Sequence, residues 1–182
     1  MKHLYIAGSK NQMIVAETPR LILRQLTLDD VDDLATINAD PVVIKFFSGT
    51  YTYERTKQWI EKIIDSYEQR GWSLWATIHK ADNKFIGRCG LMPQLVDGQR
   101  EIEIGYMLAK EYWGRGLATE AAVASRNYGF EQLRSDRLIS LIDPGNIASQ
   151  KVAMKVGLTY EKDATMWEKT VRVYTIHKYE IP

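Results

Sequence analysis

The sequence predicts one α/β domain with a mixed, mostly antiparallel sheet of about six to seven strands and helices on both faces. Short apolar or alternating runs typical of strands follow one another between longer segments with helical spacing. The length of 182 residues suits one domain, and 45% apolar residues suffice for a core. We expect residues 17–182 to form this domain and residues 1–16 to be an N-terminal arm or a weak strand.

The first third predicts a strand and two helices. Arg20 to Leu26 is rich in long and apolar side chains and predicts the first strand. Thr27 is the expected N-cap of a helix whose apolar stripe ends before Pro41. A second helix is expected from near Thr52 to a stop at Gly71.

The rest of the chain predicts six strands and two helices. The runs 72–79 and 85–92 predict a hairpin, and 93–99 a loop. Residues 100–108 alternate charged and apolar side chains, which predicts a half-buried strand. Helices are expected at about 116–133 and 146–156, and the remaining strands at 137–142, 158–161 and 170–178.

Composition and charge exclude several classes of protein. The net charge of +1 and the absence of basic runs argue against a nucleic-acid binder. No apolar run approaches the roughly 18 residues that would span a membrane. Cys89 is the single cysteine, so no internal disulfide forms, and a cytoplasmic location is expected. Cys89 itself is expected in the core. The three histidines are scattered, so we expect no metal site.

The sharpest motif is a glycine-rich turn that opens a helix, from Tyr112 to Ala121. Gly114 and Gly116 let the backbone approach a ligand, and the free amides at the helix start favour an anion such as a diphosphate. The motif is not a nucleotide P-loop, and Thr119 stands where a dinucleotide fingerprint has its third glycine. The alternative is a simple turn into a surface helix.

A second motif lies about 30 residues further along, from Asn146 to Leu158. Asn146 is an expected N-cap, and Ser149 lies in the same helical turn. A ligand-facing amide at Asn146 is the functional interpretation, and plain capping is the structural one.

Together these segments resemble the GNAT superfamily of N-acetyltransferases over about residues 17–178. Four features occur in the family's order: the EIGY strand at 103–106, the GRGLA loop at 114–118, the Asn-x-x-Ser helix at 146–149, and the KVGL exit at 155–158. The opening segment TPRLILR, residues 18–24, resembles the branch that acetylates the N-termini of ribosomal proteins.

The resemblance implies acetyl-CoA as cosubstrate. The amides of residues 115–119 would hold its diphosphate, and the backbone of 106–108 would pair with the pantetheine arm where that strand splays from 137–142 at the centre of the sheet. Asn146 would hydrogen-bond that arm, and Lys151 could meet a coenzyme phosphate. The implied binding set is Tyr106, Met107, Leu108, Trp113, Gly114, Arg115, Gly116, Leu117, Ala118, Thr119, Asn146, Ser149 and Lys151. Trp113 departs from the superfamily pattern, which usually has Gln or Arg there.

Glu103 is the candidate general base, because an attacking amine must lose a proton. The EIGY pattern singles it out, although Glu101 lies on the same strand face and both could instead be solvated. Ala153 occupies the position where a related branch has a tyrosine, so that role is not carried over. Ser149 is the substitute we expect to protonate the leaving thiolate.

The sequence leaves several candidates for the amine that accepts the acetyl group. The leading hypothesis is the amine of a protein N-terminus. A small amine, such as a polyamine, an amino acid or an aminoglycoside, is the second. A third is a non-catalytic sensor that binds acyl-CoA and needs no base. Either a monomer or a homodimer is compatible with the sequence.

Overall fold

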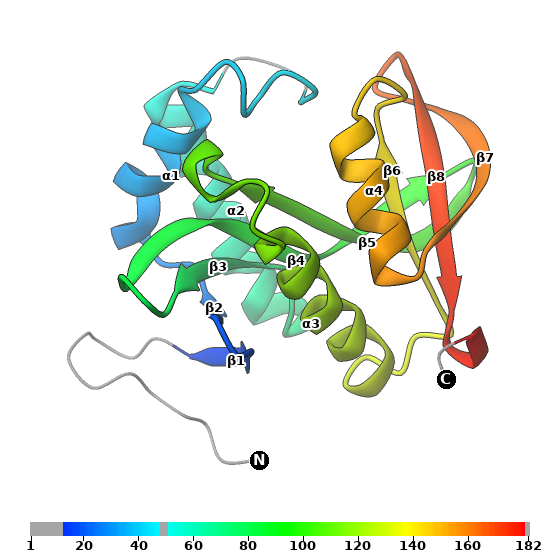
Figure 1. The fold of residues 1–182 in the computed structure, drawn as a ribbon, viewed down its shortest axis with the longest axis horizontal. Coiled ribbons are helices and arrows are strands. Elements are labelled where there is room, and N and C mark those ends of the chain that lie inside the picture. The colour runs from blue at the N-terminus through cyan, green and yellow to red at the C-terminus, as the bar shows by residue number, and fades with distance from the viewer. Residues whose placement is uncertain (1–12, 48–50, 181–182) are drawn as a thin grey trace.

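The computed structural model describes residues 13–47 and 51–180, and its centre is an eight-stranded sheet (Figure 1). The strand order is β1-β2-β3-β4-β5-β6-β8-β7. The strands are β1 (Ile14–Glu17), β2 (Leu21–Gln25), β3 (Leu74–His79), β4 (Lys84–Val96), β5 (Gln99–Leu108), β6 (Arg137–Ile142), β7 (Thr159–Met166) and β8 (Lys169–His177).

Four α-helices complete the fold. They are α1 (Val31–Asn38), α2 (Tyr53–Arg70), α3 (Leu117–Glu131) and α4 (Ile147–Val156), and short 3-10 turns lie at Leu28–Asp30, Lys110–Tyr112 and Lys178–Glu180. Thr52 caps α2 by accepting from the Arg55 amide, and Gly71 ends it in the left-handed conformation, as predicted.

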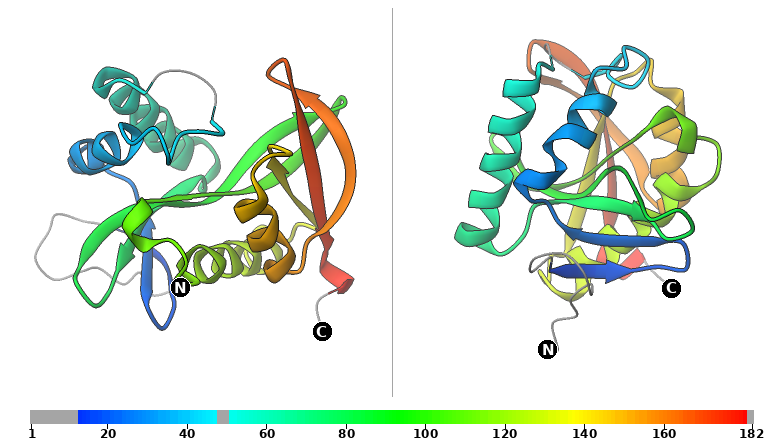
Figure 2. Two further views of the ribbon diagram at one scale, coloured as in Figure 1. Left: turned by 45° about the horizontal axis from the view of Figure 1, so that its top comes forward. Right: turned by 90° about the vertical axis from the view of Figure 1, so that its left-hand side faces the viewer.

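The sheet consists of two antiparallel parts joined by one parallel contact. Strands β1 to β5 pair in antiparallel order, and so do β6, β8 and β7. Between the two parts, β5 and β6 pair in parallel only at Glu103 and Ile139. The two parts therefore meet at one point and separate beyond it, as the central splay in the predicted fold requires (Figure 2).

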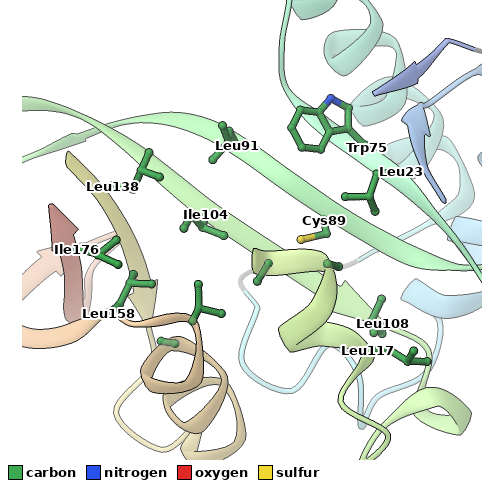
Figure 3. Packing of buried hydrophobic residues seen from close by; sticks show 14 of the residues in the cluster. Leu23, Trp75, Cys89, Leu91, Ile104, Leu108, Leu117, Leu138, Leu158 and Ile176 are labelled. Carbon is green, nitrogen blue, oxygen red and sulfur yellow. The ribbon is translucent and has the colours of Figure 1, made fainter. Parts of the chain in front are cut away.

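Each face of the sheet has its own helix layer and core. One face packs on α1 and α2 through a cluster that includes Leu34, Ile60 and Leu74. The other packs on α3 and α4 through a cluster that includes Leu91, Ile104 and Leu138 (Figure 3). Cys89 is buried in this second cluster, as expected. Helices therefore cover both faces, as predicted.

Two details of the sheet differ from the prediction. It has eight strands rather than six or seven, because β1 pairs with β2. Strand β1 crosses the predicted boundary between residues 16 and 17, and residues 1–12 of the predicted arm lie outside the described residues.

The segment 93–99 is not a loop, because β4 and β5 stay paired until Val96 meets Gln99. Asp97 and Gly98 alone make the turn, both with positive φ, a combination favoured in two-residue hairpins. Pro93 is tolerated because β3 pairs with β4 only as far as Gly90, which leaves one edge of β4 without a strand partner there.

Within the described residues, no helix combines the length and the apolar character that crossing a bilayer requires.

Replacing Gly87 by alanine should destabilise the fold, because strands approach closely there. A Cβ at Gly87 would lie 2.1 Å from the Met107 carbonyl oxygen, so the backbone would have to move. Gly98 is the matched control: its φ is also positive, but nothing lies within 4 Å of its added Cβ. We expect a loss of about 3 kcal/mol for Gly87→Ala and about 1 kcal/mol for Gly98→Ala, measured by urea denaturation. Equal losses in the two variants would contradict this account.

Candidate active site

A cavity of about 430 Å³ lies where β5 and β6 separate. Its floor comes from β4, β5 and β6, and its walls come from α2, the segment before it, the start of α4 and the β7–β8 turn. The Ser140 hydroxyl donates to the Ile104 carbonyl across the parting strands (2.9 Å). Ligand cavities commonly occupy such breaks in a sheet and have about this size. The predicted residues that line it are Glu103, Tyr106, Asn146 and Ser149.

Glu103 is the buried carboxylate of this cavity, with 7% of its surface exposed. It lies at the one residue of β5 that pairs with β6. Gln94 Nε2 donates to its Oε2 (2.6 Å), and the Leu141 amide approaches its Oε1 (3.4 Å). Burial raises the pKa of Glu103 to about 7, and the hydrogen bonds from Gln94 and Leu141 and the charge of Arg88 only partly offset it. Near neutral pH this carboxyl group can therefore accept a proton and release it.

Glu101 is on the same face of β5 but has a different environment. Arg137 Nε donates to both of its oxygens (3.1 and 3.2 Å), and Arg137 also bonds Glu161 (2.6 Å). Neither carboxylate is thus a solvated group of a strand face. Glu101 is held in an ion-pair network, and it does not line the cavity around Glu103.

The glycine loop follows the C-terminal end of β5 and opens α3. Gly114 and Gly116 adopt the left-handed conformation, with φ of 72° and 77°. The amides from Gly114 to Thr119 donate no hydrogen bond to any described residue, whereas the next amide, Glu120, bonds the Gly116 carbonyl (3.0 Å). These amides at the positive end of α3 fit a diphosphate.

The turn between β1 and β2 holds this loop in place. Arg20 Nε donates to Glu120 Oε2 (2.6 Å), and Arg20 Nη1 donates to the Arg115 carbonyl (2.8 Å). Thr18 donates to the other oxygen of Glu120 (2.6 Å). Although partial burial opposes it, these hydrogen bonds keep the pKa of Glu120 below its ordinary value. Sequence reasoning missed this contact, although Thr18 and Arg20 belong to the opening motif.

The start of α4 faces the cavity. Asn146 Oδ1 accepts from the Ser149 amide (3.1 Å), which confirms the predicted N-cap. Tyr106 donates its phenol proton to the Ser149 carbonyl (2.8 Å), which ties α4 to β5. The Ser149 hydroxyl has no hydrogen-bond partner among the described residues, so it is available to a ligand. Lys151 is exposed on α4, away from the cavity-lining set.

The remaining predicted binding residues surround the end of β5. Met107 and Leu108 are buried. Trp113 is 46% exposed, and its indole donates to the Leu108 carbonyl (2.7 Å). This tryptophan therefore connects the glycine loop to the strand that precedes it. Gln94 and Arg88 also line the cavity and were missed, Gln94 because its segment was assigned to a loop.

The described residues contain no group of three or more His, Cys, Asp or Glu side chains placed to hold a metal ion.

Comparison with known proteins concerns the chain as a whole. The model of the acetyltransferase (GNAT) domain matches residues 20–159. The protein YkkB of Bacillus subtilis is 39% identical over 140 residues, which cover 77% of this chain and 81% of that protein. The crystal structure of an acetyltransferase from Agrobacterium tumefaciens is 28% identical, with a TM-score of 0.78, over 98% of this chain and 99% of that one.

Other similar proteins act on different acceptors. Spermidine N(1)-acetyltransferase of Escherichia coli is 26% identical over 148 residues, 76% of this chain and 73% of that protein. A ribosomal-protein-S5-alanine acetyltransferase from Vibrio fischeri is 17% identical with a TM-score of 0.74, over 95% of this chain and all of that one, and it shows the shared fold.

Replacing Gly116 by valine should weaken coenzyme A binding at least about tenfold, or about 1.4 kcal/mol. Valine at φ of 77° forces the backbone to turn, and this reorients the free amides that follow. Gly71→Val is the matched control, because its φ of 82° imposes the same strain away from the loop. Binding is measured by isothermal titration calorimetry. Equal coenzyme A affinity in the two folded variants would contradict the diphosphate assignment.

Replacing Glu103 by glutamine should make stability less dependent on pH. The pKa of Glu103 in the folded protein lies above its ordinary value, so ionisation of this buried group costs folding free energy. Glu103→Gln should therefore gain stability over wild type between about pH 4.5 and about pH 7, on the order of 3 kcal/mol, and keep the gain above that. Urea denaturation across this range measures it. If the difference in unfolding free energy between the two proteins did not change with pH over this range, Glu103 would titrate normally.

Proposed function

Because the chain belongs to the GNAT family of acetyl-CoA-dependent N-acetyltransferases, we propose that it acetylates the α-amine of a protein N-terminus, with Glu103 as general base and Ser149 as general acid. The observation that carries the proposal is the buried Glu103 carboxyl, whose pKa of about 7 places it between its two protonation states at the splay of the sheet.

The residues of the cavity suit direct transfer. Acetyl-CoA supplies the activated acetyl thioester when it is bound, with the amides of residues 114–119 available to its diphosphate. Glu103 takes the proton that the acceptor ammonium must lose before its nitrogen can attack. Gln94 holds one oxygen of Glu103, so the carboxylate is oriented before the acceptor arrives. The unengaged Ser149 hydroxyl can pass to the leaving sulfur the second proton that the nitrogen loses as the amide forms, so the serine itself stays neutral.

Two features favour an enzyme over a non-catalytic sensor. Keeping a carboxylate buried costs stability, and a module that only binds acyl-CoA has no use for a proton acceptor in its cavity. The groups predicted for acid and base line the same cavity, although 46 residues separate them in the sequence.

A protein N-terminus fits the charges of the cavity better than a polyamine does. The cavity is lined by two basic residues, Arg88 and Lys169, and two acidic ones, Glu103 and Asp143. It therefore has no excess of negative charge to attract a polycation. The opening TPRLILR segment supports the same acceptor through its resemblance to the ribosomal-protein branch. A small amine with one cationic group is the second candidate.

Replacing Glu103 by glutamine should lower kcat/KM by about 10- to 1,000-fold near pH 7, while coenzyme A binding stays almost unchanged. The wild-type rate should rise with pH through about pH 7, as Glu103 ionises. The variant should recover partly at high pH, where an α-amine with a pKa of about 8 loses its own proton. Steady-state rates with peptide acceptors, read by mass shift, measure this.

Glu101→Gln is the matched control, because it removes a carboxylate from the same face of β5 but from outside the cavity. It should retain most of kcat/KM. Wild-type rates in Glu103→Gln from pH 6 to 9 would remove Glu103 from the mechanism.

A further inference from the structure

Arg88 is a buried cation in the wall of the cavity. It lies on β4, only 7% of its surface is exposed, and it lines the same cavity as Glu103. Its guanidinium stacks over Trp59 (4.5 Å to the ring centroid) and lies 5.6 Å from the Phe47 ring. The two aromatic faces stabilise the positive charge and fix its position.

This guanidinium has almost no hydrogen-bond partner in the described structure. Its one hydrogen bond there goes from Nη2 to the Met107 sulfur (3.9 Å), and sulfur is a weak acceptor. No described carboxylate lies within salt-bridge distance of it. A buried guanidinium with unused donors is costly unless an anion pairs with it.

The same protein contains a buried arginine with a structural role, and that one is fully paired. Arg24 is 6% exposed and forms two hydrogen bonds with the Asp30 carboxylate, at 2.8 and 2.6 Å. It also donates to the Gln25 carbonyl (3.0 Å). Arg24 and Arg88 are equally buried, but only Arg88 borders a cavity and lacks its carboxylate. Among the described residues, Arg88 thus keeps donors that an anion bound in the cavity could engage.

The strand register places Arg88 on the same face of the sheet as Glu103. Arg88 pairs with Met107, and side chains four residues apart on β5, Glu103 and Met107, share one face. The Cα atoms of Glu103 and Met107 are about 14 Å apart along β5. The long side chain of Arg88, which lies opposite Met107, covers part of that distance. Gly105 and Met92 line the cavity between them, and the Met92 Cε lies 3.0 Å from the position that a Cβ at Gly105 would take.

Building on the function proposed above, we propose that Arg88 binds a carboxylate of the acceptor and so selects amines that carry a carboxylate near the reacting nitrogen. The carboxylate is either the acidic side chain of an early residue in a protein N-terminus or the free carboxylate of an amino acid. A polyamine would place an ammonium group against this guanidinium, and like charges in a shared pocket oppose binding.

The test compares acceptors that differ in one carboxylate. Peptides with Glu or Asp at position one, two or three are paired with their Gln or Asn twins, and free amino acids are paired with their amides. The wild-type enzyme should prefer the acidic member of at least one pair by about tenfold or more in kcat/KM. In Arg88→Met the ratio should fall to near one, and in Arg88→Lys to an intermediate value.

Two controls separate recognition from folding. The double variant Arg24→Met with Asp30→Asn removes the other buried arginine and should keep the acidic preference. Coenzyme A affinity should be unchanged in Arg88→Met, which shows an intact fold. A preference seen only with peptides identifies a protein N-terminus as the acceptor, and one seen only with amino acids identifies a small molecule.

No preference for any acidic acceptor in the wild type, or a preference that survives in Arg88→Met, would overturn the assignment of Arg88. In that case Glu103-dependent acetylation of the neutral twins would leave the proposed function standing. Failure of the wild type to acetylate any amine would instead remove the proposed function, and this assignment with it.

Discussion

The structure depends on one constraint: β5 and β6 pair at Glu103 and Ile139 and nowhere else. Because β5 and β6 pair at a single position, the two strands diverge on leaving it. The resulting gap forms a cavity at the centre of the sheet and not at its edge. Glu103 lies at that point, which makes it buried by the fold yet open to a ligand. The raised pKa of this carboxyl follows from burial more than from any single neighbour.

Charged side chains inside this cavity differ from those elsewhere in how they are paired. Away from it, Arg24 is paired with Asp30, and Arg137 is paired with Glu101 and Glu161. Inside it, Glu103 has a neutral amide partner and Arg88 has aromatic faces and a sulfur atom. Incomplete pairing leaves both groups able to respond to a bound molecule, at a cost in stability that the two cores offset.

The glycine loop shows how distant segments cooperate in one binding element. Its left-handed glycines free six consecutive amides, but these become a fixed surface only because Arg20 joins the Arg115 carbonyl to Glu120 of α3. The turn between the first two strands thus supports a loop about 95 residues further along. Because its position is set in advance, little conformational entropy is lost when an anion binds.

The sequence by itself determined the order of the elements from β2 onward, the start of α2 near Thr52 and its stop at Gly71, the cap at Asn146, and the family, because these depend on local spacing and on motifs that stay contiguous. It misjudged residues 93–99, since Pro93 suggests a loop unless the free edge of β4 is known. The surroundings of Glu103, its separation from Glu101 and the buried, unpaired charge of Arg88 were decided by the tertiary structure alone. Burial and pairing depend on which strands and helices surround a side chain, and residues far apart in the chain supply those neighbours.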